Sequence, residues 1–424
     1  MNQPLSRYVD YMYSYPHKTA YRPFPAPVSL LPYLEQLQGR KASLYFHIPF
    51  CSHKCRYCNL FSLQTNRTEY IATYLDTLHR QAQQLSPLTA GLTFDSFAIG
   101  GGTPLLLTVP QLEQLMATAA LFGVHPSHAF TSVETSPEYA DRPRLNVLKK
   151  AGVSRVSIGI QSFQDEELKA IKRRPRQNTI YQALDDIRQM DFPYFNIDLI
   201  YGIKGQTVES FLYSLEEALR FQPNELFIYP LYVRQGTGIT EREPDDVCFR
   251  MYRAACKLLQ AKGFLQTSMR RFIHHPSTDA EVSCGDEVML SCGSGGRSYL
   301  GDLHYATRYT VCQQCIAREI DEYMATTDFT VARNGFILSA KEQQQRFIIK
   351  NLMYYMGIDK AEYTRRFGEP LDRTPLFRQL AEQYWIEETP ERIRLTPEGL
   401  GYSDYIGQLF ITPEIRQLME TYSY

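Results

Sequence analysis

Three cysteines stand close together in the segment YFHIPFCSHKCRYCNLFS, with the spacing C-x3-C-x2-C at Cys51, Cys55 and Cys58. A loop with such short spacings can gather three thiolates around one compact centre, and thiolates are the natural ligands of iron–sulfur clusters. Three ligands on a cubic cluster leave one iron open, which is what a catalytic cluster needs. A zinc knuckle with His47 or His53 as fourth ligand is the structural alternative, but it gives no reason for the series of strands and helices that follows. The spacing therefore favours a catalytic iron–sulfur site.

Six further cysteines bring the total to nine. An odd number cannot all pair, and in a long unsecreted chain we expect reduced thiols. Cys312 and Cys315 form a C-x2-C pair that would need Cys284 and Cys292 to complete an auxiliary metal site. Inert buried thiols are the simpler interpretation, and both stay open. Core packing accounts for the remaining two, Cys248 and Cys256.

The composition excludes several classes of protein. Of 424 residues, 44% are hydrophobic, and 45 basic residues nearly cancel 46 acidic ones, for a net charge of −1. This balance argues against intrinsic disorder and against a nucleic-acid-binding polyelectrolyte. No stretch reaches the roughly 18 apolar residues of a membrane span, and the N-terminal residues lack the apolar core of a signal peptide. We therefore expect a cytoplasmic protein with no membrane span and no nucleic-acid partner.

The thiol loop follows the first of six short apolar runs, which alternate with amphipathic helical stretches. The runs cover residues 44–48, 94–100, 129–134, 155–160, 194–202 and 225–233; helical patterns include 69–85, 111–121, 178–190, 208–219 and 246–262. Repeated strand–helix units predict a parallel sheet with right-handed crossovers and helices outside. Six units are too few for an eight-stranded barrel, so the expected α/β fold is a partial (β/α)6 barrel.

Four segments are expected along the chain. They are an N-terminal extended arm (1–42), the partial barrel (43–263), a loop-rich connecting segment (264–335) and a C-terminal helical, winged-helix-like module (336–424). The last segment balances its arginines (365, 366, 373 and 378) with acidic residues (362, 369, 372 and 382). No basic face emerges, which argues against a DNA-binding module; a lid over the substrate side of the barrel is the hypothesis that we prefer.

The thiol loop also resembles that of a known family. With Tyr57 just before the third cysteine, it is similar to the signature of radical S-adenosylmethionine (SAM) enzymes. The Y-x-H-I-P-F-C segment resembles the oxygen-independent coproporphyrinogen III dehydrogenases and the related heme chaperones, in a bacterial subgroup. The resemblance runs from about Leu44 to Val233 and returns weakly in the L-T-x-x-G of residues 395–399. It implies a [4Fe–4S] cluster on Cys51, Cys55 and Cys58, SAM on the open iron, a 5′-deoxyadenosyl radical, and an electron donor such as flavodoxin.

Polar or glycine residues end the successive strands, where parallel-strand proteins bind ligands. Glycines let backbone groups approach a ligand closely, and an amide such as that of Gln161 can bridge two hydroxyls. The resemblance assigns to SAM binding Tyr45, Gly101, Gly102, Thr103, Glu134, Gln161, Arg173 (or, by a one-residue shift, Arg174) and Asp198. Tyr45, expected near the methionine part of SAM, is also the candidate catalytic residue.

Two departures from the family leave the substrate open. Leu60 stands where coproporphyrinogen dehydrogenases carry a further cysteine, and the H-N-x-x-Y-W pattern of the heme chaperones is missing, since the one tryptophan is Trp385. His304, in the corresponding region, is a candidate heme ligand or substrate contact, although a loop histidine is more often neither. The activity implied is oxidative decarboxylation of a porphyrinogen propionate, with a tetrapyrrole as substrate. The alternatives are a heme-binding chaperone that keeps the cluster and a radical SAM methyltransferase.

Overall fold

A computed structural model describes residues 7–9, 12, 14–125, 128–173, 177–234, 236–274, 288–371 and 375–423. Four residues named above, Arg174, Cys284, Asp372 and Arg373, lie outside these ranges. Within them, one mixed sheet of 13 strands forms the centre of the molecule, and a three-stranded sheet belongs to the C-terminal module.

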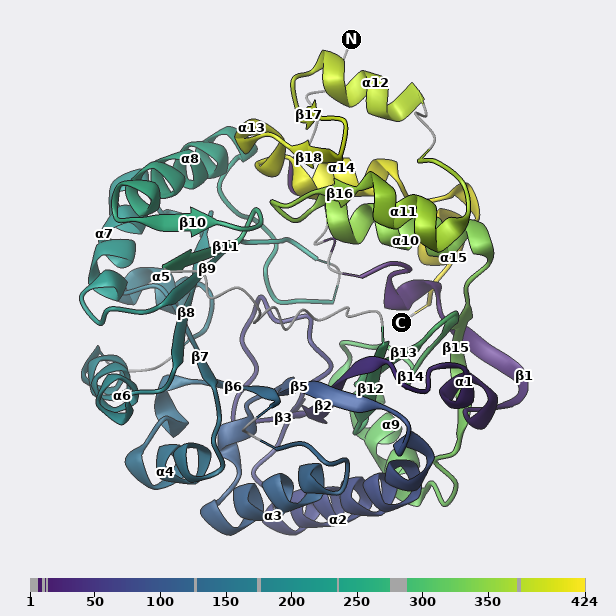
Figure 1. Ribbon diagram of the computed structural model, residues 1–424. Coiled ribbons are helices and arrows are strands. Elements are labelled where there is room, and N and C mark those ends of the chain that lie inside the picture. Colours follow the sequence, from purple (N-terminus) through teal and green to yellow (C-terminus); the bar gives the residue numbers. More distant parts are fainter. Residues whose placement is uncertain are drawn as a thin grey trace.

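Six neighbouring parallel strands form the partial barrel that the sequence predicts (Figure 1). They are β2 (Lys41–Ile48), β5 (Thr93–Gly101), β6 (Phe130–Thr135), β7 (Arg155–Gln161), β8 (Tyr194–Tyr201) and β9 (Glu225–Pro230). Helices cover the outside: α2 (Thr68–Leu85), α3 (Val109–Ala120), α4 (Arg142–Lys150), α6 (Gln177–Met190), α7 (Val208–Leu219) and α8 (Asp245–Ala261). Helix α2 illustrates why these helices pack against the sheet. Its buried residues Ile71, Leu75, Leu78 and Ala82 recur every three or four positions, which gives the helix one apolar face.

The connecting segment is not loop-rich, and this expectation was wrong. Strand β12 (Val288–Cys292) pairs with β2 in parallel and extends the barrel sheet by one strand. The sheet then continues through antiparallel strands β13 (Arg297–Leu300), β14 (Leu303–Ala306), β15 (Val331–Ile337) and β1 (Arg22–Ser29), while β11 (Arg271–His274) and β10 (Phe264–Gln266) extend the other edge. These strands are too short for a clear alternating pattern, and several of their partners lie far away in sequence. The four-segment division itself stays a prediction.

The C-terminal module has its own apolar core. Residues such as Phe347, Leu352, Ile393 and Ile406 form a separate buried cluster that also includes Tyr15 of the N-terminal arm. The elements are α10 (Ala340–Leu352), β16 (Ile358–Asp359), α11 (Lys360–Phe367), α12 (Pro375–Glu382), β17 (Ile386–Glu388), β18 (Arg392–Leu395), α13 (Pro397–Leu400), α14 (Ser403–Leu409) and α15 (Pro413–Glu420). The C-terminal part is therefore helical, as expected, and carries a small three-stranded sheet.

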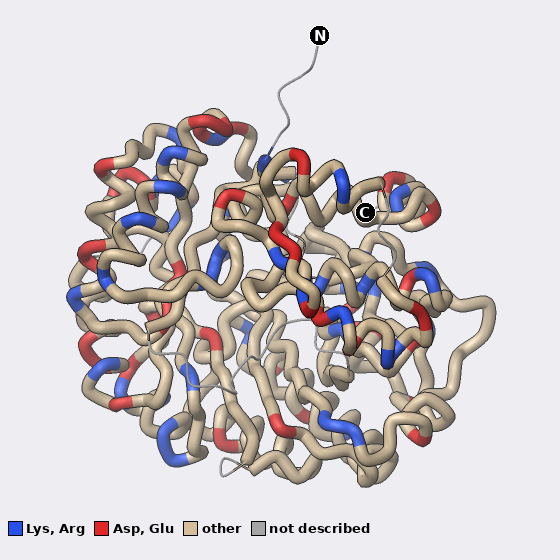
Figure 2. Tube along the Cα trace, turned by 45° about the horizontal axis from the view of Figure 1, so that its top comes forward, with Lys and Arg blue, Asp and Glu red and all other residues tan. Residues whose placement is uncertain are grey.

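Charge and hydropathy agree with the composition. In the view of Figure 2, basic and acidic residues are interspersed along the outer helices and show no broad face of one sign. Among the residues described, no helix is both long enough and apolar enough to cross a membrane.

Candidate active site

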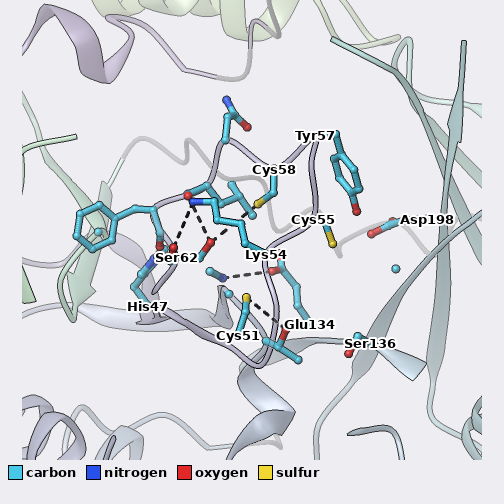
Figure 3. A pocket seen from close by; sticks show the side chains of 18 of the residues that line it. His47, Cys51, Lys54, Cys55, Tyr57, Cys58, Ser62, Glu134, Ser136 and Asp198 are labelled. Atoms are coloured by element: carbon cyan, nitrogen blue, oxygen red, sulfur yellow. Dashed lines mark hydrogen bonds between the residues drawn. The ribbon is translucent and has the colours of Figure 1, made fainter. Parts of the chain in front are cut away.

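A cavity of about 430 Å³ contains all eleven residues that the sequence singles out for the cluster and the cofactor (Figure 3). Its lining includes the three cysteines and Tyr45, Gly101, Gly102, Thr103, Glu134, Gln161, Arg173 and Asp198. These residues come from β2 and the loop after it, from the carboxyl-terminal parts of the next parallel strands and the turns after them, and, for Arg173, from the turn after α5 (Asp165–Ala170). Their meeting follows from the parallel sheet, which brings the carboxyl ends of its strands to one edge.

The thiol loop is fixed at both ends. Its first residues form β3 (Phe50–Cys51), which pairs with β4 (Leu63–Gln64) just beyond the loop. The backbone N–H of Gly102 donates to the carbonyl of Ile48 at 2.8 Å, and that of Thr103 donates to the carbonyl of Phe50 at 2.8 Å. The loop is thereby tied to the end of β5 before any ligand is considered.

The donor set around the loop fits an iron–sulfur cluster. Three partly exposed free thiols share the cavity, and Thr103 Oγ1 donates to Cys51 Sγ at 3.6 Å. Arg173 Nη1 donates to Cys55 Sγ at 3.6 Å, so a cation faces the negative charge that thiolate ligands bring. Within the described ranges, no three His, Cys, Asp or Glu side chains converge as they would on a single ion. A cubane cluster would take its three thiolates on three different irons. Thiols that lie apart therefore fit a cluster better than they fit a single zinc ion.

His47 is not placed to be the zinc ligand considered above, because both of its ring nitrogens have hydrogen-bond partners. Its Nε2 lies 2.9 Å from the carbonyl oxygen of Phe61 and its Nδ1 lies 3.1 Å from the hydroxyl of Tyr45. Burial lowers the pKa of His47 to about 4, so the ring is neutral at physiological pH. Because the Phe61 carbonyl can only accept, Nε2 carries the proton and Nδ1 accepts from Tyr45. The Tyr45 hydroxyl is thus oriented by a fixed tautomer.

Glu134 lies against the glycine segment at the end of β5. The N–H of Gly101 donates to Glu134 Oε2 at 3.3 Å, and a Cβ on Gly100 would lie 2.8 Å from the same oxygen. Desolvation raises the pKa of Glu134 and the Gly101 hydrogen bond partly opposes this shift. A carboxylate acceptor that is exposed to the cavity beside glycine backbone suits an ammonium group of a ligand.

Arg173 offers the matching site for a carboxylate. Its Nη2 donates to the carbonyl of Gly159, whereas its buried Nε has no hydrogen-bond partner among the residues described. A buried N–H without a partner needs an explanation, and a bound anion supplies one. Glu134 and Arg173 therefore present opposite charges for an amino-acid group.

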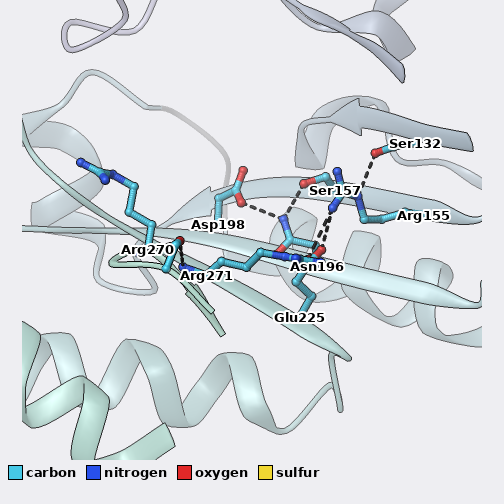
Figure 4. A network of polar contacts seen from close by, with 9 residues as sticks. Ser132, Arg155, Ser157, Asn196, Asp198, Glu225, Arg270 and Arg271 are labelled. Carbon is cyan, nitrogen blue, oxygen red and sulfur yellow. Dashed lines mark hydrogen bonds and ion pairs between the residues drawn. The ribbon is translucent and has the colours of Figure 1, made fainter. Parts of the chain in front are cut away.

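Asp198 is held by a polar network beneath the cavity (Figure 4). Asn196 Nδ2 donates to Asp198 Oδ1 at 2.8 Å, and burial raises the pKa of Asp198 to about 7. Behind it, the nearly buried Glu225 pairs with both Arg155 and Arg271. The charges of Glu225 and the two arginines offset each other, whereas a single buried charge at this place would destabilise the fold.

Five basic residues of the cavity wall were not predicted from the sequence. They are Lys18, Lys54, Arg234, Arg297 and Arg308, from the N-terminal arm, the thiol loop, the loop after β9, β13 and the loop after β14. Lys54 and Arg234 lie in or beside predicted elements, whereas the sheet extension by β12–β14 is needed to bring Arg297 and Arg308 to the same wall.

One candidate contact and the expected lid do not agree with the cavity lining. His304 is fully buried and packs its ring against that of Tyr299, with centroids 4.5 Å apart and planes tilted by 57°, and it is not among the described residues that line the cavity. The C-terminal module does not form the expected lid: no described residue beyond Tyr309 lines the cavity. The module instead holds lining residues from behind, with Asp404 accepting from Tyr232 and Tyr422 donating to the carbonyl of Tyr309.

Comparison with known proteins agrees with this architecture. Residues 45–218 match the Radical SAM superfamily and residues 338–401 the HemN C-terminal domain. The oxygen-independent coproporphyrinogen III oxidase of Salmonella typhimurium is 31% identical over 394 residues, covering 85% of this chain and 83% of the relative. The heme chaperone HemW of Bacillus subtilis is 27% identical over 386 residues, covering 87% and 100%.

A solved structure shows the same fold. The coproporphyrinogen III oxidase of Escherichia coli, described as a radical SAM enzyme, superimposes with a TM-score of 0.80 at 23% identity, over 95% of this chain and 97% of that one. The chain thus belongs to the radical SAM family that includes the oxygen-independent coproporphyrinogen III oxidases and the heme chaperones.

Proposed function

We propose that this chain is a radical SAM oxidoreductase that acts on a tetrapyrrole bearing several carboxylates, by oxidative decarboxylation of a propionate as in coproporphyrinogen III oxidase. Cys51, Cys55 and Cys58 would hold a [4Fe–4S] cluster, and the strand-end residues would hold SAM. Together, when bound, these groups supply a 5′-deoxyadenosyl radical that abstracts a substrate hydrogen.

The observation that carries the substrate class is the charge of the cavity wall. Six cationic side chains line the cavity, against two carboxylates among the described lining residues: Lys18, Lys54, Arg173, Arg234, Arg297 and Arg308 against Glu134 and Asp198. Such an excess in a cleft attracts anions and raises their local concentration. Tetrapyrroles with propionate groups match this charge, and the relatives named above act on coproporphyrinogen or handle heme.

The protein groups divide the cavity between cofactor and substrate. Arg173 and Glu134 suit the carboxylate and the ammonium of SAM, and Asp198 suits its ribose hydroxyls. The Tyr45 hydroxyl donates to His47 and lies beside these groups on the cavity wall. Lys18, Arg297 and Arg308 belong to segments outside the six-strand series, and we assign them to the recognition of substrate carboxylates.

Anaerobic reconstitution with iron and sulfide tests the radical chemistry. With dithionite or reduced flavodoxin, wild type should convert SAM to 5′-deoxyadenosine, and Cys55→Ala should not. Cys256→Ala is the matched control, because this half-buried thiol lies on α8 and outside the cavity lining. Well-reconstituted protein that forms no deoxyadenosine would contradict the proposal.

The substrate is tested with coproporphyrinogen III. We expect release of CO2, and we expect Arg297→Ala to raise the KM for the porphyrinogen while SAM cleavage without substrate stays near wild type. A tight heme complex with a shifted Soret band and no decarboxylation would favour the chaperone alternative. Formation of S-adenosylhomocysteine with a methylated tetrapyrrole would favour the methyltransferase.

A further inference from the structure

A pair of thiols outside the cavity lies at the start of α9 (Gln313–Ala325). Cys312 is the N-cap residue and is exposed, and Cys315, in the first turn, is half-buried. The N–H of Cys315, the thiol of Cys315 and the N–H of Gln314 all contact the Cys312 sulfur and lower its pKa. The hydrogen bond with Cys312 raises the pKa of Cys315 in turn. Cys312 is therefore the thiol of the pair that ionises first, and the Cys315 thiol lies beside it.

Among the residues that the structure describes, which do not include Cys284, the surroundings of the pair do not complete a metal site. Cys292, a candidate third ligand, is fully buried in β12 as part of the main apolar core. In the part of the chain that the structure describes, no three metal-binding side chains are grouped. An exposed thiol beside a half-buried partner is instead the arrangement of a dithiol that reacts with external disulfides.

The pair is also tied to the thiol loop of the active site. Gln313, between the two cysteines, donates from Nε2 to the carbonyl of Ser62 at 2.8 Å and accepts from the N–H of Gln64 at 2.8 Å. On the other side of Cys312, the carbonyl of Val311 accepts from Lys54 Nζ at 3.5 Å. These hydrogen bonds form a direct path from the residues beside Cys312 to residues 54–64.

We propose that Cys312 and Cys315 are a reversible dithiol–disulfide pair that exchanges with a low-molecular-weight disulfide such as oxidised glutathione and loosens the thiol loop when oxidised. The Cys312 thiolate attacks the external disulfide, whose S–S bond breaks and releases one thiolate. The Cys315 thiolate then attacks the Cys312 sulfur and releases the second. Two protein thiols are oxidised, one disulfide is reduced to two thiols, and two electrons and two protons pass to it.

The exchange is tested anaerobically on the full chain in glutathione buffers of increasing oxidised fraction, followed by alkylation, trypsin digestion and mass spectrometry. Cleavage after Arg308 and Arg318 gives one peptide, residues 309–318, that holds both cysteines. In wild type this peptide should lose two hydrogens and show no lasting glutathione adduct. Cys315→Ser should accumulate glutathione on Cys312, and Cys312→Ser should show neither product.

Two outcomes overturn the exchange. The first is a wild-type peptide that keeps both thiols in a buffer that contains only oxidised glutathione. The second is a glutathione adduct on Cys312 that persists in wild type as it does in Cys315→Ser. Cys256→Ser should behave as wild type.

Hydrogen exchange at the backbone amide of Gln64 tests whether oxidation of the cysteine pair loosens the thiol loop. In the reduced protein this amide is protected by its hydrogen bond to Gln313. Oxidation should speed this exchange several-fold in wild type and leave Gln313→Ala, already unprotected, unchanged. Disulfide formation with no change at Gln64 would overturn the link. These measurements need no cluster, so they stand apart from the test of the proposed function.

Discussion

Arg270 and Asp404 form an ion pair with an Nη2–Oδ1 distance of 2.6 Å although their side chains are only 5% and 1% exposed. Arg270 lies between β10 and β11, and Asp404 lies on α14 of the C-terminal module. Both also hydrogen-bond the hydroxyl of Tyr232, which lines the cavity. The pair therefore joins the module to the cavity wall.

Breaking this pair should destabilise the fold strongly. Arg270→Met leaves a buried carboxylate without its cation, and we expect a loss of about 3–5 kcal/mol in the free energy of unfolding. Arg270→Met/Asp404→Asn removes the stranded charge and keeps an acceptor for Tyr232, so it should be more stable than the single variant. Urea unfolding measures both, and a double variant less stable than Arg270→Met would contradict this account.

Asp198 should make stability depend on pH. Its pKa is raised by burial from 3.8 to about 7, so the folded state holds a proton that the unfolded state has lost between these values. The contribution of the Asp198 carboxyl to the free energy of unfolding is fully present below about pH 4, where the group is protonated. This contribution is lost as the pH rises toward 7. Asp198→Asn should gain up to about 4 kcal/mol relative to wild type above pH 7 and nothing below pH 4.

Urea titrations from pH 4 to 8 measure the difference. Asp95→Asn, in β5, is the control for the same substitution at a carboxylate outside the cavity lining. A parallel pH profile for wild type and Asp198→Asn would show that Asp198 is charged in the fold throughout.

Gly101 should not tolerate a side chain. Its φ of +117° is outside the range of L residues, and a Cβ would lie 2.8 Å from the His47 ring. Gly101→Ala should therefore displace His47 and lower SAM affinity at least about tenfold, or about 1.4 kcal/mol, by equilibrium dialysis. Gly123→Ala is the control, since its φ is +71° but a Cβ meets nothing within 4 Å; equal losses in both variants would point to backbone strain alone.

Lys18 should be coupled to Tyr309 at the cavity wall. The Lys18 ammonium lies 3.6 Å from the centre of the Tyr309 ring, and such pairs contribute about 0.5–1 kcal/mol. A double-mutant cycle with Lys18→Met and Tyr309→Leu should return a coupling of this size in the free energy of unfolding. Tyr309→Phe keeps the ring and should retain the coupling while it loses the hydroxyl contact with Asn59. A coupling of zero would refute the cation–π contact.

The sequence alone determined the parts of this protein that are local in the chain. The spacing of Cys51, Cys55 and Cys58 depends on one loop, and the alternation of strands and helices predicts the order β2 to β9, because each strand is followed by its own covering helix. The strand-end residues Glu134 and Asp198 then meet without further information, since parallel strands end at one edge of the sheet.

Only the tertiary structure decided what surrounds this centre. Strand β12 pairs Leu290 with Leu44, and Arg270 meets Asp404 across a separation of 134 residues. Short strands and single charged residues carry no periodic signal, and their partners are chosen by burial and charge compensation across the whole fold. For this reason the spacing of the cysteines predicts the chemistry, whereas the basic wall that favours an anionic substrate exists only after the chain has folded.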